Sequence, residues 1–221
     1  SACRPPASSR MPSLTSRPST YNTAAIHTAG RALMLLGCCA LVDVEAVGGC
    51  FVEARAVGEA MLRGGNAKRA LVIGAEVFSR LLDFNDRTTC VLFGDGAGAA
   101  IFELAADPTP FAVMLGARGD AAIHAGGPSR AGSAPITMDG RAVFRFAVDA
   151  LPKCLHAVLD ETQLTLDDLS WVVCHQANSR IIDHCIKHLN TDPAKFYKNM
   201  ERHGNTSAAS IPVALNELAE A

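Results

Sequence analysis

The chain has 221 residues, of which 49% are hydrophobic and 19% are charged, and its formal net charge is −2. This composition predicts a globular protein with a sizeable core and argues against a disordered chain. A net charge this small gives no electrostatic reason to expect nucleic-acid binding. No apolar run reaches the length of a membrane-spanning helix. We therefore expect neither nucleic acid nor a membrane among the partners.

The cysteine pattern indicates the redox environment. None of the eight cysteines forms a CxxC pair, and most lie inside apolar runs. This pattern argues against a metal site or a disulfide framework and favours buried thiols in a reducing compartment. The cysteines are Cys3, Cys38, Cys39, Cys50, Cys90, Cys154, Cys174 and Cys185.

The N-terminal segment has an unusual composition. Residues 1–42 contain no Asp or Glu, and residues 1–20 are rich in Ser, Pro and Arg. Three interpretations stay open: an organelle transit peptide, a poorly ordered tail over residues 1–22, or a segment foreign to the ancestral domain. We prefer the poorly ordered tail. The stretch around Cys38 also resembles, faintly, a lipoprotein signal.

The first half of the chain predicts alternating helices and strands. Gly48-Gly49 makes a tight step at the start of one helix, and Gly64-Gly65 ends it, as glycine does at helix C-termini. Apolar patterns predict helices over residues 23–37 and 45–64, and strands over residues 39–43, 69–75, 88–93 and 97–104.

The glycine-rich turn at residues 94–98 invites a nucleotide interpretation. However, its spacing is not GxGxxG and no helix is predicted after it, whereas a phosphate loop needs a helix N-terminus. We prefer a structural turn between two strands.

The second half begins after a short linker at residues 107–110. Strand, helix and strand recur in both halves, which predicts a parallel α/β architecture with two similar parts, residues 23–106 and 111–221. The predicted elements are strands at 111–115 and 171–174, a loop at 118–136, helices at 140–160 (kinked at Pro152), 178–189 and 207–219, and an extended piece near 196–197.

Two polar clusters at loop-to-helix junctions form the chemical hypothesis. His175 stands at the end of a predicted strand and just before a helix, and Asn205 stands in a similar place before the last helix. In open α/β sheets, ligands bind at that edge. The plainer alternatives are a satisfied loop histidine and an asparagine that serves as a turn or cap residue.

Two longer motifs around these residues carry a family resemblance. Residues 175–181, His-Gln-Ala-Asn-Ser-Arg-Ile, and residues 204–212, Gly-Asn-Thr-Ser-Ala-Ala-Ser-Ile-Pro, resemble the signature stretches of β-ketoacyl-acyl-carrier-protein (ACP) synthase III. Residues 67–103 look like the same family, and the similarity covers roughly residues 43–218. The resemblance implies an α/β fold of the thiolase-like type, layered α/β/α/β/α, with two similar halves.

The resemblance also implies an activity. Members of the family are acyltransferases that start fatty-acid synthesis by decarboxylative condensation of acyl-CoA with malonyl-ACP. By resemblance we expect those two substrates as partners, no cofactor, no metal, a homodimer and a cytoplasmic location.

The family's chemistry explains the residue types. A cysteine thiolate at a helix N-terminus takes the acyl group, and a lowered thiol pKa favours that step. A His and an Asn then donate hydrogen bonds to the malonyl thioester oxygen as CO₂ leaves; Asn cannot act as a base, which suits an oxyanion-type site. The resemblance assigns these roles to His175 and Asn205.

Five further residues match family positions along the path by which CoA or the ACP pantetheine reaches the site. The arginines suit phosphate contacts. The plainer alternative for each arginine is a solvated surface charge, and for the phenylalanine it is a core aromatic. The five are Arg87, Phe144, Ala177, Asn178 and Arg180.

The sequence departs from the family at the nucleophile. Gly48 stands where the catalytic cysteine belongs, and Cys50 stands where a glycine belongs. A shift of two residues on a helix turns a side chain by about 200°. Cys50 is therefore either a displaced nucleophile, which the flexible Gly48-Gly49 step would permit, or a buried structural cysteine.

The sequence also lacks the family's first βαβ region and its last strand pair, so we expect a fold truncated at both ends. Two hypotheses follow. The first is an active condensing enzyme that uses Cys50, His175 and Asn205. The second is a truncated, catalytically impaired homologue that serves as a non-catalytic partner subunit or retains only malonyl-thioester decarboxylation.

Overall fold

The computed structural model describes residues 31–36, 40–45, 50–106, 110–124, 128–129, 132–133 and 135–221. The tail expected over residues 1–22 lies outside the described residues. So do Gly48, Gly49 and most of the expected linker.

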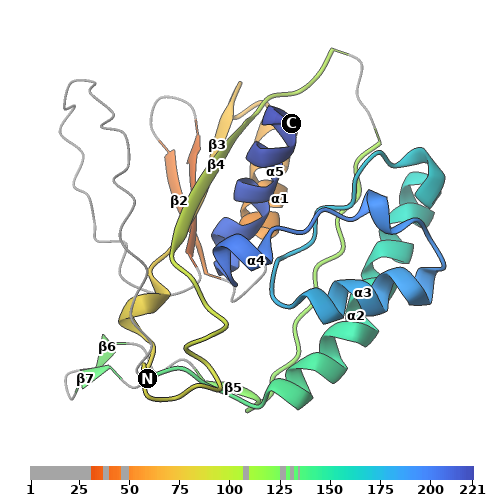
Figure 1. Ribbon diagram of the computed structural model, residues 1–221. Coiled ribbons are helices and arrows are strands. Elements are labelled where there is room, and N and C mark those ends of the chain that lie inside the picture. Colours follow the sequence, from red (N-terminus) through yellow and green to blue (C-terminus); the bar gives the residue numbers. More distant parts are fainter. Residues whose placement is uncertain are drawn as a thin grey trace.

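A four-stranded sheet forms the first layer, in the order β2-β1-β3-β4. Every ladder in it is antiparallel. Helices α1 (Cys50–Arg63) and α5 (Ser210–Glu220) lie on the same side of this sheet (Figure 1). The strands are β1 (Arg31–Leu36), β2 (Ala40–Glu45), β3 (Ala70–Glu76) and β4 (Gly96–Phe102).

One apolar cluster joins this sheet to the helices. Residues of β3 alternate between buried and partly buried positions, so that one face of the strand points at the helices. The buried members of this cluster come from α1, from β3 and from the short 3₁₀ helix η4 (Ser207–Ala209). They are Phe51, Ala54, Leu62, Ala70, Val72 and Ala208.

Two predictions for the first half were wrong. Residues 31–36 form strand β1 and not the end of a helix, because a short apolar run is ambiguous and here β2 and β3 pair with both of its edges. The predicted parallel pairing is antiparallel instead. A parallel return requires a long crossover, and between β3 and β4 the described chain holds only the 3₁₀ helix η1 (Phe78–Arg80).

Three segments predicted as strands are not strands. Residues 88–93 form turns with a single bridge from Phe93 to Asn205, and residues 111–115 are irregular. In the segment 171–174 only Val172 pairs, in a parallel bridge with Phe196. Each run is apolar enough for a strand, but a strand needs a partner edge. The described chain supplies one bridge to each of two runs and none to residues 111–115.

Two short antiparallel strand pairs lie within and just after the predicted loop at residues 118–136. One pairs β5 (Ile123–His124) with β8 (Thr137–Met138), and the other pairs β6 (Pro128–Ser129) with β7 (Gly132–Ser133).

Helices form at all three places predicted for the second half. Helix α2 (Gly140–Thr162) is capped by Asp139 and continues through Pro152. Helix α3 (Ser179–Leu189) packs on α2 through its apolar face, away from the sheet (Figure 1). The remaining elements are η2 (Leu166–Asp168), η3 (Pro193–Lys195) and α4 (Met200–His203).

Two glycines of the first half allow a loop of the second half to lie directly on the sheet. A Cβ on Gly74 would come within 2.2 Å of the Ala208 carbonyl oxygen, and one on Gly94 within 2.1 Å of the His203 carbonyl oxygen. No side chain fits at either position without moving the backbone opposite. Consequently the loop between α4 and α5 is held at contact distance from β3 and the residues before β4.

We predict that Gly74→Ala destabilises the protein by about 1 to 3 kcal/mol, because the added methyl overpacks the contact with Ala208. Urea denaturation measures this free energy of unfolding. Gly116→Ala is the matched control, since Gly116 is exposed and a Cβ there meets nothing within 4 Å. Equal stabilities of the two variants would show that the loop does not depend on this close approach.

Candidate active site

His175 lies in the loop that leads into α3. Its Nδ1 is 2.8 Å from the Ser210 Oγ at the start of α5. The Ser210 hydroxyl donates to the Ser207 carbonyl oxygen over 2.7 Å and accepts from the Gln176 backbone N–H over 3.3 Å. A hydroxyl has one hydrogen, so in this arrangement the proton between His175 and Ser210 belongs to Nδ1. The Nε2 lone pair then faces away from Ser210.

The surroundings of His175 keep its ring neutral. Burial of the ring lowers the pKa of His175 from its ordinary 6.5 to about 4, against a smaller raising effect of a hydrogen bond with the Ser207 backbone. At neutral pH the imidazole therefore carries no charge. A neutral imidazole supplies one N–H donor and one acceptor. His175 can therefore bind a ligand through hydrogen bonds and not through a charge.

Asn205 is anchored to the first half of the chain by its backbone. Its N–H donates to the Leu92 carbonyl oxygen over 2.8 Å, and its own carbonyl oxygen accepts from the Gly94 N–H over 3.0 Å. The side-chain Oδ1 accepts from the Ser207 N–H over 2.9 Å. Within the described chain the Nδ2 group makes no hydrogen bond, so both of its N–H donors are available to a ligand.

His175 and Asn205 are brought together by one short segment. Ser207 contacts Asn205 through its N–H and Ser210 through its carbonyl oxygen, and Ser210 contacts His175. The turn uses positive φ at Gly204 (69°) and at Ser207 (46°). For Ser207 this conformation is strained, and the Ala208 N–H beyond it donates to the buried Glu76 carboxylate over 3.3 Å.

Cys50 is the first residue of α1. Phe51, which follows it, is buried in the same apolar cluster as Ala208. The N-terminus of α1 therefore lies against the segment that follows Asn205, and α1 contacts η4 directly. The helix predicted from residue 45 is described from Cys50 onward, and Glu45 belongs to β2. The side chain of Cys50 lies outside the described part of the structure.

The predicted substrate-binding residues lie in different surroundings. Arg87 is exposed in the turn that leads to Phe93, and Arg180 is exposed in the first turn of α3. Asn178 caps α3, its Oδ1 accepting from the Arg180 N–H over 2.9 Å. Phe144 packs edge-on against His184, with 6.3 Å between ring centroids, and Ala177 is partly buried beside His175.

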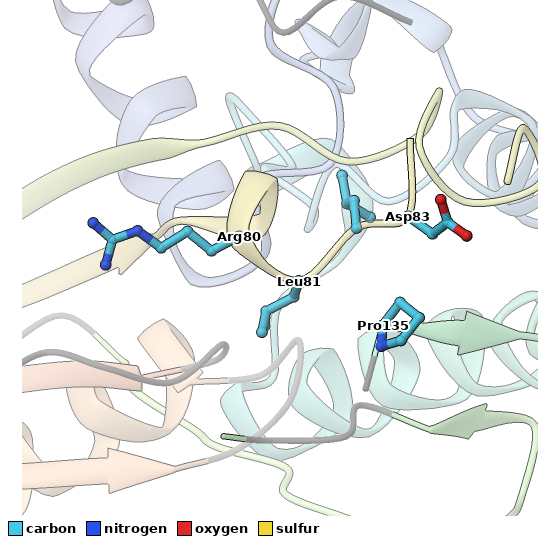
Figure 2. Close-up of a pocket in the computed structure, with 5 residues that line it drawn as sticks. Arg80, Leu81, Asp83 and Pro135 are labelled. Carbon is cyan, nitrogen blue, oxygen red and sulfur yellow. The ribbon is translucent and has the colours of Figure 1, made fainter. Parts of the chain in front are cut away.

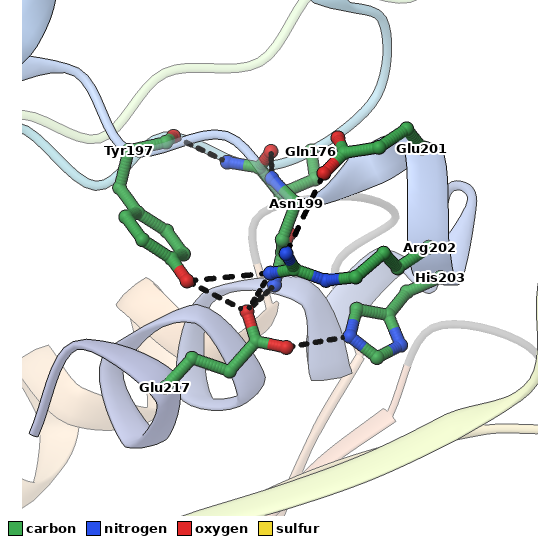
Figure 3. A network of polar contacts seen from close by, with 7 residues as sticks. All are labelled: Gln176, Tyr197, Asn199, Glu201, Arg202, His203 and Glu217. Atoms are coloured by element: carbon green, nitrogen blue, oxygen red, sulfur yellow. Dashed lines mark hydrogen bonds and ion pairs between the residues drawn. The ribbon is translucent and has the colours of Figure 1, made fainter. Parts of the chain in front are cut away.

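Sequence analysis missed a carboxylate that organises the surroundings of both loops. Glu217 on α5 accepts hydrogen bonds from four side chains (Figure 3). Partial burial by itself would raise the pKa of Glu217, but the bonds outweigh it and lower the pKa to about 2. A signal was present, because Ser210, Ala214 and Glu217 recur at helical spacing and so share one face of α5. The four donors are His203, Asn199, Tyr197 and Arg202.

Buried thiols were also predicted. Cys174 and Cys185 are buried and free, which confirms the prediction at these positions. Burial raises the pKa of Cys174 to about 12. Neither thiol has the character of a nucleophile.

Two hollows lie near the surface, and neither is lined by His175 or Asn205. One, of about 320 Å³, is lined by Arg80, Leu81, Leu82, Asp83 and Pro135 (Figure 2). The other, of about 470 Å³, lies between β4 and α5 and is lined by Ala97, Gly98, Ala99, Pro212, Val213, Asn216, Glu217 and Glu220. Among the described side chains no group of His, Cys, Asp and Glu is arranged to hold a metal ion. None of the described helices combines the length and apolar character needed to cross a membrane.

Sequence models of one family match both halves of the chain. The model of 3-oxoacyl-[acyl-carrier-protein] synthase III matches residues 42–119, and the model of its C-terminal part matches residues 159–221. The second match contains His175, Asn205, Ser210 and Glu217. The chain belongs to the β-ketoacyl-ACP synthase III family. The two family matches contain most of the described sheet together with Cys50, His175 and Asn205, whereas Phe144 lies between them.

Individual members support this assignment. The chain is 51% identical to the β-ketoacyl-ACP synthase III of Rhizobium johnstonii over 183 residues, which cover 78% of this chain and 57% of that protein. It is 46% identical to the enzyme of Rhizobium meliloti over 210 residues, covering 90% and 64%. The chain thus spans less than two thirds of the length of these relatives.

Solved structures of the family confirm the predicted thiolase-like α/β fold. The 3-oxoacyl-ACP synthase III of Aquifex aeolicus superposes with a TM-score of 0.74 at 38% identity, covering 80% of this chain and 57% of that one. The Thermus thermophilus enzyme gives 0.74 at 36% identity, covering 80% and 58%.

The pKa of His175 predicts a pH-dependent stability. The unfolded chain binds a proton at His175 below about pH 6.5, and the folded chain binds it only below about pH 4. In that window the unfolded state holds more protons, so the free energy of unfolding falls as the pH is lowered. We expect a slope of up to about 1.4 kcal/mol per pH unit from this one group.

Urea midpoints between pH 6.5 and 4.5 measure this slope. Glu217 adds nothing there, because its pKa falls from an ordinary 4.5 to about 2 and its stabilisation is lost only below pH 4.5. In His175→Asn the slope should decrease by up to the same amount. An unchanged slope in that variant would show that His175 titrates normally in the folded protein.

Proposed function

We propose that this chain carries out the reaction of a β-ketoacyl-ACP synthase III, the decarboxylative condensation of an acyl-CoA with malonyl-ACP that starts fatty-acid synthesis. The observation that carries the proposal is the pairing of a neutral His175 with an uncommitted Asn205 amide, next to the N-terminus of α1. Family membership supports it, because the matched stretches contain these residues. Each half of the chain, residues 23–106 and 111–221, contributes part of the site.

The first chemical step uses Cys50. Its thiolate attacks the carbonyl carbon of the acyl-CoA thioester, and CoA leaves as the thiolate that takes up the proton. The acyl group is then held as a thioester on Cys50. A position at the head of α1 favours the thiolate, because the partial positive charge of a helix N-terminus lowers a thiol pKa.

The second step uses His175 and Asn205 on the malonyl thioester. An Asn205 Nδ2–H and a His175 Nε2–H donate to the thioester carbonyl oxygen, the carboxylate leaves as CO₂, and the electron pair forms the enolate. The enolate carbon attacks the acyl carbonyl, and the Cys50 thiolate is expelled. Donors fixed before the reaction stabilise such an oxyanion without reorganisation.

Ser210 determines which nitrogen of His175 donates. With its hydrogen on the Ser207 carbonyl oxygen, the hydroxyl accepts from Nδ1–H. If the hydroxyl turns and donates to Nδ1, the ring proton resides on Nε2, where the thioester oxygen would bind. The low pKa of His175 suits this tautomeric exchange, because no charged imidazolium is needed.

The substrate path is the remaining part of the proposal. Arg87 and Arg180 would contact the phosphates of CoA or of the ACP pantetheine as charge-assisted donors. Phe144, Ala177 and Asn178 would line the path near α3. A homodimer and a cytoplasmic location complete the proposal. The curated relatives named above are bacterial and lend no support to a transit peptide.

A second candidate is malonyl-thioester decarboxylation without condensation. It is favoured by the direct bridge between the two donors, since Ser207 and Ser210 link Asn205 to His175 without using a thiol. The replacement of the expected cysteine by Gly48 points the same way. The idea of a non-catalytic subunit gains no support from the comparisons.

Acylation of Cys50 separates the two candidates. After incubation with a short acyl-CoA, we expect one acyl adduct on Cys50 by peptide mass spectrometry, and none in Cys50→Ser. Cys154→Ser is the matched control, because Cys154 is a partly exposed free thiol on α2. An adduct that persists in Cys50→Ser, or none in the unaltered chain, would exclude condensation through this residue.

Asn205→Asp tests the donor. The substitution keeps an oxygen for the Ser207 N–H but removes both N–H donors, so we expect malonyl-thioester decarboxylation to slow by about 10²- to 10³-fold. Release of CO₂ from malonyl-CoA gives the rate. Asn216→Asp makes the same change on the exposed side of α5 and should retain the activity. Equal rates for the two variants would remove Asn205 from the site.

A further inference from the structure

The Glu217 carboxylate binds four side chains from one stretch of chain, residues 197–203. Its Oε2 accepts from Tyr197 Oη at 3.0 Å, from Asn199 Nδ2 at 2.7 Å and from Arg202 Nη2 at 2.8 Å. Its Oε1 accepts from His203 Nε2 at 2.7 Å. In Figure 3 all four donors converge on this carboxylate from the segment that precedes Asn205.

Gln176 makes the corresponding contacts on the other loop. It follows His175 directly and is 1% exposed. Its Nε2 donates to the Cys174 carbonyl oxygen at 2.9 Å and to the Tyr197 carbonyl oxygen at 3.1 Å. Its Oε1 accepts from the Asn199 N–H at 3.1 Å. Both N–H groups and the oxygen of this buried amide are thus used.

Asn199 connects the two groups. Its backbone N–H binds Gln176 and its side chain binds Glu217, and it is 1% exposed. A continuous path therefore runs from the residue after His175, through Asn199 and Glu217, to His203, which stands just before Gly204 and Asn205. This path meets the Ser207–Ser210 bridge only where the Gln176 backbone N–H donates to the Ser210 hydroxyl, and its side-chain contacts are distinct from that bridge.

We propose that Glu217 and Gln176 are positioning residues, which hold the His175 loop and the Asn205 loop in the register that lets both side chains reach one thioester oxygen. The inference rests on the proposed function. Neither residue touches the substrate; each acts through the backbone next to a donor.

The chemistry of the network supports a positioning role. The network consists of polar groups, whereas the apolar clusters of the fold are made of other residues. Buried polar groups specify one geometry, because an unmade hydrogen bond in a low dielectric is costly. Oxyanion donors need such accuracy, since a displacement of about 1 Å reduces a rate about 10²-fold.

Glu217→Gln tests the inference with little change in shape. The substitution replaces one acceptor oxygen by an NH₂ group that faces donors of Asn199 and Arg202 or of His203. Glu220→Gln is the matched control: it removes the same charge from the same helix, where Glu220 is exposed and, within the described chain, accepts one hydrogen bond, from Asn216. Thermal unfolding checks that both variants are folded.

Two measurements give the result. In Glu217→Gln we expect the kcat of malonyl-CoA decarboxylation to fall about 10- to 100-fold with KM changed much less, because only the transition-state donors move. We also expect the pKa of His175, followed by NMR of its ring protons, to rise from about 4 toward 6.5 as the loop loosens. Glu220→Gln should change neither.

The NMR titration does not depend on activity. If the unaltered chain lacks decarboxylase activity, the proposed function fails while the coupling of Glu217 to His175 is still measured. A folded Glu217→Gln protein in which His175 titrates as in Glu220→Gln overturns the inference, and so does a loss of stability alone. If Glu217→Gln does not fold, His203→Phe removes a single donor, and the same two outcomes then decide.

Discussion

The close approach of the Asn205 loop to the backbone of the β3–β4 region is the constraint on which the site depends. Gly74 and Gly94 leave no room for side chains, and the peptide groups of Asn205 bond to Leu92 and Gly94 on both sides. The loop that carries Asn205 is thereby fixed to the sheet of the first half by main-chain geometry. Such a contact is insensitive to side-chain rotation, which suits a residue whose amide must be held in place.

Small polar groups then determine how the side chains of Asn205 and His175 are oriented. Ser207 and Ser210 form the bridge between Asn205 and His175, and their hydroxyl, carbonyl and N–H groups set the direction of the amide and of the imidazole. Burial lowers the pKa of His175 and keeps the ring neutral. The strained φ of Ser207 is tolerated because the sheet beneath and Glu76 hold the loop from the other side.

The same logic explains why the acid on α5 is ionised in a partly enclosed place. Four donors surround Glu217 and hold its pKa near 2, so the negative charge is compensated by Arg202 and by hydrogen bonds. A partly satisfied network of this kind would be worse than an apolar one. Here both carboxylate oxygens of Glu217 accept hydrogen bonds. These bonds offset the burial of the charge and connect the stretch before Asn205 to α5.

The sequence by itself determined the family, the thiolase-like α/β fold and the identity of His175 and Asn205 as candidates, because these depend on local motifs. It also located α2, α3 and α5, since the 3.6-residue period and the caps of a helix are local. Only the tertiary structure decided that residues 31–36 pair as a strand, that residues 88–93 and 171–174 do not, and that Ser210, Gln176 and Glu217 surround the site. Strand pairing and polar networks depend on which distant segments meet, and a local pattern of residues carries no information about that meeting.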